Sequence, residues 1–150
     1  MEIDNLMITL RGSHIEDLIL LAENAMDDDI DTSPSEIRLW ARYNMDCGPV
    51  YTAECGGKII AAGGMRIVRS GLGDLWITIS KDIEHSYGFL KEALTAMRNM
   101  TEILAETFGI RKMRIISRIG FPASQSLLRH LGFRRLRKVW KSYYIYTRRF

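Results

Sequence analysis

Two neighbouring stretches in the last third of the chain decide its fold: Gly-Ile-Arg-Lys-Met-Arg-Ile-Ile (109–116) and Ser-Leu-Leu-Arg-His-Leu-Gly-Phe (126–133). In the first, a glycine ends a long helical pattern and a strand follows at once. In the second, leucines at helical spacing lead to Gly132, where a left-handed backbone can end a helix. Together they predict a long helix, a strand, a short helix and a further strand, in that order.

The residues before this region predict the long helix and a three-stranded meander. Apolar residues at helical spacing place the helix from Ile83 to Phe108. Glycine-rich turns divide the preceding stretch into strands, and Gly63-Gly64 inside the second strand indicates a bulge or a close approach of another group. The three strands are expected at Val50–Cys55, Lys58–Val68 and Leu75–Ser80, with a loop at Ser70-Gly71-Leu72-Gly73.

Two capping patterns predict two helices ahead of the meander. Ser13-His14-Ile15-Glu16 matches the S-x-x-E box, in which the serine and glutamate side chains satisfy free amides of a first helical turn. A weakly alternating strand, Leu6 to Leu10, precedes it. Ser33-Pro34-Ser35-Glu36 repeats the box with proline at the first helical position, and Gly48 and Pro49 stop this second helix.

The chain is expected to end in two basic strands, which completes the architecture. The last elements are predicted at Lys112–Ser117 (strand), Gly120–His130 (short helix), Leu136–Val139 and Ser142–Thr147 (strands). A length of 150 residues suits one domain covering residues 1–150. We therefore predict an α+β fold with a mixed, mostly antiparallel sheet of six to seven strands, flanked by about four helices.

Composition excludes several classes of protein. No apolar run approaches the roughly 20 residues that cross a bilayer, so neither a membrane-spanning segment nor a membrane partner is expected. Cys47 and Cys55 are too few for a disulfide framework, and no accompanying Cys/His pair has zinc-ligand spacing. A soluble cytoplasmic protein without a metal is the expectation.

Charge is distributed unevenly along the chain. Residues 1–110 hold 9 Lys/Arg and 18 Asp/Glu, a net charge of −9, whereas residues 111–150 hold 12 Lys/Arg and no acid, a net charge of +12. This asymmetry indicates that residues 111–150 face an acidic protein partner, a phosphate-bearing ligand or a nucleic acid. The alternative is that these cations pair with the acidic first part of the chain.

The order of elements, together with the two stretches quoted first, resembles the GNAT N-acetyltransferase superfamily. Members of that superfamily end the same short helix with Leu-Gly-Phe, which stands here at Leu131-Gly132-Phe133. The resemblance covers essentially the whole chain. It implies an acyltransferase fold with acetyl-CoA as cofactor.

A second resemblance concerns the meander. Ala61-Ala62-Gly63-Gly64-Met65, followed by Gly73-Asp74-Leu75-Trp76-Ile77-Thr78-Ile79-Ser80, is similar to GNAT-like proteins of tailed bacteriophages, including internal virion proteins. It implies virion proteins as partners, and a location in the host cytoplasm or the virion.

The GNAT resemblance implies a pyrophosphate seat of free backbone amides at a helix N-terminus, where the helix dipole favours an anion. In the family this loop reads Arg/Gln-x-x-Gly-x-Gly/Ala. The corresponding stretch here is His85-Ser86-Tyr87-Gly88-Phe89-Leu90, so His85 and Gly88 are the candidate cofactor-binding residues. Asp82 and Glu84 add negative charge to the same loop, which weakens acetyl-CoA binding.

Pantetheine pairing and catalysis are assigned to other residues. A strand pairs with the pantetheine amides through its backbone, which assigns Trp76, Ile77, Thr78, Ile79 and Ser80 to the cofactor. Four residues before the glycine of the Gly-Phe pair, the family commonly has a Tyr that acts as the acid for the departing thiolate, and Leu128 stands there instead. Candidate general bases are Asp74 and Glu54.

Three functions follow from these observations. The first is a structural or interaction role in a virion or its assembly, with an eroded acetyl-CoA loop. The second is an active acetyl-CoA-dependent N-acetyltransferase acting on an amine. The third is a nucleic-acid-binding adaptor, in which basic residues interleaved with Trp140, Tyr143, Tyr144, Tyr146 and Phe150 contact phosphates and bases.

Overall fold

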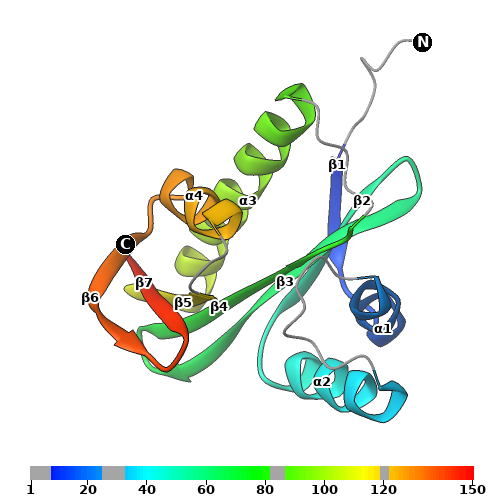
Figure 1. Cartoon of the computed structure of the whole chain (residues 1–150), viewed down its shortest axis with the longest axis horizontal. Coiled ribbons are helices and arrows are strands. Elements are labelled where there is room, and N and C mark those ends of the chain that lie inside the picture. Colours follow the sequence, from blue (N-terminus) through cyan, green and yellow to red (C-terminus); the bar gives the residue numbers. More distant parts are fainter. Residues whose placement is uncertain (1–7, 25–32, 82–86, 119–121) are drawn as a thin grey trace. The chain divides into compact units, whose positions relative to one another are not determined.

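The computed structural model describes residues 8–24, 33–81, 87–118 and 122–150 (Figure 1). Seven strands form one sheet in the order β1-β2-β3-β4-β5-β7-β6. The pairs β1–β2, β2–β3, β5–β7 and β6–β7 are antiparallel, and β4–β5 is parallel. The elements are β1 (Ile8–Gly12), α1 (Ile15–Glu23), α2 (Pro34–Asp46), β2 (Val50–Cys55), β3 (Lys58–Arg69), β4 (Leu72–Ile79), α3 (Tyr87–Phe108), β5 (Lys112–Arg118), α4 (Pro122–His130), β6 (Arg134–Trp140) and β7 (Tyr143–Arg149). This architecture confirms the predicted fold class.

Two compact units make up the chain, and each is described by itself. Unit 1 comprises Met1–Arg66 and Ile77–Glu92, and unit 2 comprises Ile67–Trp76 and Ala93–Phe150. β4 contributes to both units, up to Trp76 in unit 2 and from Ile77 in unit 1. The prediction of a single domain stays a prediction.

In unit 1, the first helix is capped differently from the prediction. Its N-cap is His14, whose backbone amide donates to the carboxylate of Asp17 at 2.8 Å. Ser13 lies outside the helix, and its hydroxyl pairs with that of Thr52 at 2.6 Å. The predicted Ser13–Glu16 box is therefore wrong by one residue, because Thr52 on the neighbouring strand competes for the serine hydroxyl. The second helix begins at Pro34 after Ser33, as predicted.

The irregularity in the pairing of β2 with β3 lies away from Gly63 and Gly64, and the close approach predicted there as the alternative stays a prediction. On the β2 side, Gly63 pairs with Tyr51 and Gly64 with Val50 in regular register, and the irregularity falls between Ala53 and Glu54. Gly48 has no room for a side chain, because a Cβ there would collide with the carbonyl oxygen of Met65. The bulge predicted at Gly63-Gly64 is wrong on this side of β3.

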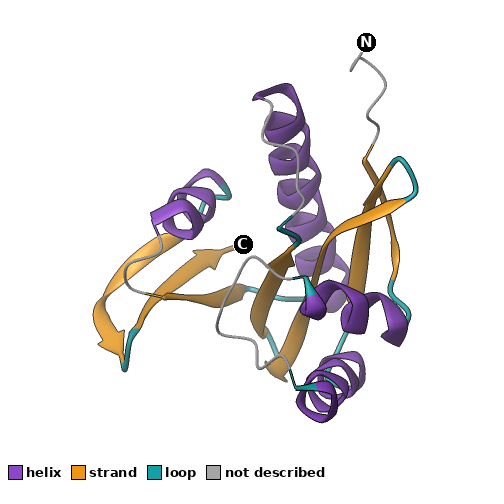
Figure 2. Ribbon diagram, turned by 45° about the vertical axis from the view of Figure 1, so that its right-hand side comes forward, coloured by secondary structure: helices purple, strands orange, loops and turns teal. Residues whose placement is uncertain are grey.

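In unit 2, α4 follows β5 in the chain and contacts it (Figures 1 and 2). Along β5, the buried side chains of Met113, Ile115 and Ser117 alternate with less buried ones, as the two-residue period of a strand requires. Arg148 of β7, which pairs with Met113, donates to Thr101 of α3 at 3.2 Å and to the carbonyl of Leu131, directly after α4, at 3.1 Å. The core of unit 2 is made by Leu104, Ala105, Met113, Ile115, Leu128, Leu131, Phe133 and Tyr146.

Both glycines singled out in the sequence end helices of unit 2 in the left-handed conformation, with φ of 62° at Gly109 and 88° at Gly132. After Gly132, the amide of Phe133 donates back to the carbonyl of Leu128 at 3.0 Å. This bond, with the buried Leu128 and Phe133 side chains, forms a Schellman motif. The Leu-Gly-Phe sequence is thus a helix stop whose aromatic residue is part of the core.

Several strands extend beyond their predicted limits. β4 begins at Leu72, inside the predicted loop, because the turn takes only Ser70 and Gly71 and Leu72 already pairs with Lys112 of β5. β6 spans Arg134–Trp140 because the pairing with β7 continues to Trp140, opposite Tyr143. Among the described residues, no helix is long and apolar enough to cross a membrane.

Candidate functional site

The separation of β4 from β5 defines the candidate site. Within the described residues, these parallel strands pair only over Leu72–Lys112, Gly73–Met113 and Asp74–Arg114. β4 continues to Ile79, while β5 continues along β7 to Arg118. From Leu75 onward, no strand among the described residues pairs with the edge of β4 that faces away from β3.

The side chains of β4 also change phase where the pairing has ended. Buried positions fall at Gly73 and Leu75 and then at Thr78 and Ser80, so the two-residue alternation skips one residue. The backbone amide of Ser80 donates to Ile60 of β3 at 2.9 Å.

Two backbone positions of β4 consequently present hydrogen-bonding groups at the open edge. Successive residues of a strand direct their N–H and C=O groups to alternate edges. Because Ser80 bonds toward β3, Thr78 is directed the same way, and Ile77 and Ile79 are directed toward the open edge. An extended ligand with amide groups can pair with such an edge.

The residues assigned to the cofactor from the sequence divide into two groups. Trp76, Ile77, Thr78 and Ile79 lie on the open part of β4, and Ser80 follows it, with its hydroxyl held by the side chain of Asn24 at 3.2 Å. Gly88 lies in the first turn of α3 as described. His85, like Asp82 and Glu84, lies outside the described residues.

Asp74 stands at the last residue pair before the strands separate. Its Oδ1 accepts a hydrogen bond from Nε of Arg114 at 2.7 Å, and the two side chains are 31% and 39% exposed. The second carboxylate oxygen accepts no hydrogen bond from a described residue. Asp74 therefore keeps a water-accessible oxygen beside the open edge of β4.

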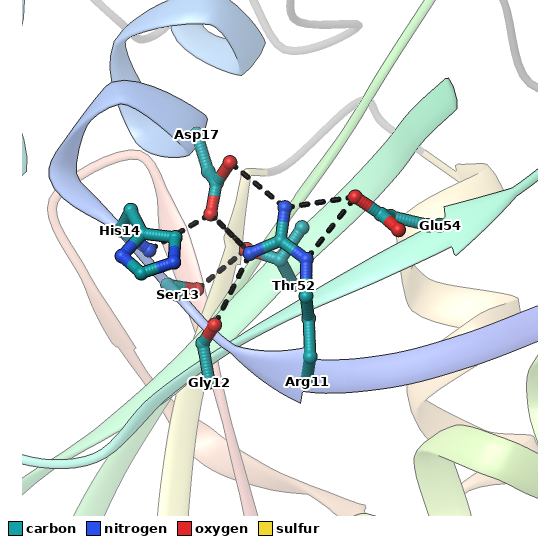
Figure 3. Close-up of polar contacts among 7 residues, drawn as sticks. All are labelled: Arg11, Gly12, Ser13, His14, Asp17, Thr52 and Glu54. Carbon is teal, nitrogen blue, oxygen red and sulfur yellow. Dashed lines mark hydrogen bonds and ion pairs between the residues drawn. The ribbon is translucent and has the colours of Figure 1, made fainter. Parts of the chain in front are cut away.

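Glu54 belongs to a larger cluster in unit 1, centred on Arg11 (Figure 3). The Arg11 guanidinium donates to Glu54 Oε1 from both Nε (3.1 Å) and Nη2 (2.8 Å). It also donates to Asp17, from Nη1 at 2.6 Å and from Nη2 at 3.0 Å. One guanidinium therefore joins β1, β2 and the first turn of α1.

The electrostatics of this cluster favour the charged form of the Asp17 carboxyl group. The hydrogen bond from Arg11 is the largest cause that lowers the pKa of the Asp17 carboxyl below its ordinary value, and burial opposes it. The backbone amide of His14 and the hydroxyl of Thr52 lower this pKa further. Asp17 in turn raises the pKa of Arg11 more than Glu54 does. The cluster connects β1, β2 and α1, and it occupies one carboxylate oxygen of Glu54.

The position at which the family places an acidic tyrosine is filled by core packing. Leu128 is only 2% exposed and forms the Schellman contact with Phe133. No proton donor is available from that side chain. Among the described residues, no group of three or more His, Cys, Asp or Glu side chains is arranged to hold a metal ion.

Sequence reasoning missed the guanidinium partners of both proposed bases. The signal for Arg11 is the register of β1 and β2, where Arg11 pairs with Thr52 and Glu54 lies two residues further on the same face. The signal for Arg114 is its direct pairing with Asp74 across β4 and β5. Neither register can be read from local periodicity.

Comparison with solved structures identifies the fold. RimL, a ribosomal L7/L12 alpha-N-protein acetyltransferase in complex with coenzyme A, aligns with a TM-score of 0.72 at 14% identity, covering 99% of this chain and 96% of its own. A GNAT-family acetyltransferase from Bacillus anthracis aligns with a TM-score of 0.71 at 11% identity, covering 95% and 94%. YncA of Salmonella typhimurium, described as an acetyltransferase with its cofactor acetyl-CoA, aligns with a TM-score of 0.68 at 15% identity, covering 95% and 93%.

The chain has the fold of the GNAT N-acetyltransferases. No family model matches the sequence, and no curated protein matches it. At these identities, the agreement with the solved structures concerns the fold alone.

Proposed function

We propose that the chain binds acetyl-CoA along the open edge of β4 and transfers the acetyl group to an amine. The observation that carries this proposal is the end of β4–β5 pairing at Asp74–Arg114, five residues before β4 itself ends. The open edge offers the N–H and C=O groups of Ile77 and Ile79 to the two amides of pantetheine. Coenzyme A and acetyl-CoA in the solved structures RimL and YncA support the choice of ligand.

The chemistry asks for two proton movements. Bound acetyl-CoA supplies an activated acetyl thioester, and the amine nitrogen forms a bond to the acetyl carbon while the carbon–sulfur bond breaks. The amine gives up one proton, and the departing thiolate takes one up. We assign the role of accepting the proton of the amine to Asp74, through the carboxylate oxygen that Arg114 does not hold.

The absence of an acid at Leu128 lowers the rate without preventing the reaction. A cysteine-like thiol has a pKa of about 8.5, so a thiolate is a tolerable leaving group near neutral pH. Solvent can then protonate it after departure. Glu54 stays a second candidate base, although one of its oxygens is held by Arg11.

Isothermal titration of acetyl-CoA into the full chain tests the proposal. We expect micromolar binding, and no detectable heat at millimolar acetyl-CoA would overturn it. The sharper comparison is Ile77→Pro with Ile77→Ala. Proline removes one N–H from the open edge, which a strand tolerates at an unpaired position, and should abolish binding. Alanine keeps the backbone and should bind as the wild type does; equal binding by both variants would show that pantetheine does not pair there.

A second function is favoured by Leu128 and by the arginine partners of both carboxylates. These features fit a GNAT-fold protein that acts through interactions alone, in a virion or its assembly. This alternative predicts folded protein, no heat with acetyl-CoA, and no release of free thiol from acetyl-CoA in the presence of amines.

A further inference from the structure

The sheet of unit 2 has a second face that α3 and α4 leave uncovered. On β5, the buried residues Met113, Ile115 and Ser117 alternate with Lys112, Arg114 and Ile116, which are exposed or half-buried. The register with β7 and β6 places the corresponding residues of those strands on the same side. We call this side the open face; its residues are Lys112, Arg114 and Ile116 of β5, Tyr143, Ile145, Thr147 and Arg149 of β7, and Arg134 and Trp140 of β6.

The open face runs from cations at one end to aromatic rings at the other. Lys112 pairs with Arg149 in the first row, and Arg114, Thr147 and Arg134 make the second. Ile116 and Ile145 follow, and Tyr143 and Trp140 form the last row. Rows two residues apart along a strand are about 7 Å apart, so the four rows span about 20 Å.

The aromatic end lies at the tip of the β6–β7 hairpin and is accessible. The rings of Trp140 and Tyr143 lie 5.9 Å apart between centroids, at an interplanar angle of 31°. Trp140 is 47% exposed, as is Ile116 in the adjacent row. Lys141, in the hairpin turn with a φ of 53°, holds its ammonium 4.8 Å from the Trp140 ring centroid. The tip thus combines ring faces with a cation.

Most cations of the open face, and Lys141 of the adjacent hairpin turn, form no ion pair with the part of the chain that the structure describes. Arg114 pairs with Asp74, but Lys112, Arg134, Lys141 and Arg149 form no ion pair with any described residue. The alternative raised by the sequence, that the basic segment is neutralised within the chain, holds for Arg114 and for Arg148, which pairs with Glu102 at 3.1 Å. Among the described residues, positive charge without an acidic partner therefore lies on a surface that also exposes aromatic and aliphatic groups.

We propose that the open face binds single-stranded nucleic acid, with phosphates at the cationic rows and a base stacked at Trp140 and Tyr143. Single-strand binding surfaces combine these two elements, a positively charged path and aromatic platforms. An acidic peptide would satisfy the cations but would leave the rings without a matching group.

A second copy of the chain is a poorer occupant. β6 is an edge strand, and pairing it with β6 of another copy would align Arg134, Arg135, Arg137 and Lys138 with like charges. Cations on an edge strand oppose such pairing.

The proposal is tested by fluorescence anisotropy with the full chain and a labelled oligothymidylate of roughly 15 nucleotides, across salt from about 50 to 200 mM. Four phosphate contacts predict a slope of log K against log salt of about −3. Arg134→Gln with Arg149→Gln should reduce the slope by about 1.4. Trp140→Ala should weaken binding by about 5- to 150-fold and leave the slope unchanged.

The matched control is Arg38→Gln with Arg42→Gln, which removes two exposed charges from α2 in unit 1. It should leave both affinity and slope as in the wild type. The proposal would be overturned if the wild type did not bind the oligonucleotide at low salt. It would also be overturned if the Arg38/Arg42 control variant lost as much affinity as the Arg134/Arg149 variant. If poly-glutamate displaces the oligonucleotide and Trp140→Ala binds normally, the surface serves an acidic protein and the proposal is wrong.

Discussion

Two carboxylates were candidates for the same chemical role, and the structure surrounds them differently. Glu54 shares the Arg11 guanidinium with Asp17, through four hydrogen bonds that tie two strands to a helix. Asp74 accepts one hydrogen bond from the residues that the structure describes, from Arg114, at the point where β4 leaves β5. The comparison teaches that a carboxylate with several fixed contacts supports the fold, whereas one with a single contact beside an open edge is available for chemistry.

The largest effect should separate the two carboxylates in catalysis. If Asp74 accepts the proton of the amine, Asp74→Asn should lower kcat by about 100-fold or more, because general-base catalysis contributes about 10²- to 10⁴-fold. Glu54→Gln should leave kcat close to that of the wild type. Release of free thiol from acetyl-CoA with a panel of amines measures both. A larger loss for Glu54→Gln would reverse the assignment.

A smaller effect should appear in the stability of the fold, at the Arg11 cluster that contains Glu54. Asp17→Ala removes the bond to the His14 amide and the contacts with Arg11, and hydrogen bonds to charged groups contribute about 1.5–3 kcal/mol. We expect a loss of about 2 kcal/mol in the free energy of unfolding, measured by urea denaturation. The control is Asp46→Ala, an exposed aspartate of α2, which should change this free energy by less than about 0.5 kcal/mol. Equal effects would mean that the Arg11 cluster contributes nothing.

The smallest effect concerns pH. The pKa of Asp17 is lower in the folded state than its ordinary value of 3.8, so its stabilising contribution is complete above that value. It is lost as the pH falls through the lower folded-state pKa. The free energy of unfolding should therefore fall with decreasing pH below about 4, and Asp17→Asn should flatten this fall. An unchanged pH profile in the variant would contradict the assigned cause.

The order of the elements could be predicted because it depends on local signals. Gly109, Gly132 and Pro34 end or begin helices for reasons of backbone conformation that each residue carries with it. The limits of β4 and β6 could not be predicted, because a strand extends as far as its neighbours pair with it. Leu72 and Trp140 are in strands because they pair with Lys112 and Tyr143.

The candidate site was predicted in its residue types but not in its contacts. The sequence predicted Trp76 on a strand with Asp74 directly before it, and the structure extends this strand back to Leu72. The Arg11 and Arg114 partners arise from pairing between segments distant in sequence. The first capping box was predicted one residue too early for the same reason, since Thr52 holds Ser13 from 39 residues away. Residue contacts across strands therefore decided which carboxylate keeps an available oxygen.

Amide hydrogen exchange, followed by NMR with and without acetyl-CoA, tests the central claim most directly. Exchange slows where an amide gains a hydrogen-bond partner. We expect acetyl-CoA to slow exchange at Ile77 and Ile79 and to leave exchange at Ser80, which already donates to Ile60, unchanged. Binding that leaves Ile77 and Ile79 exchanging as in the free protein would contradict it.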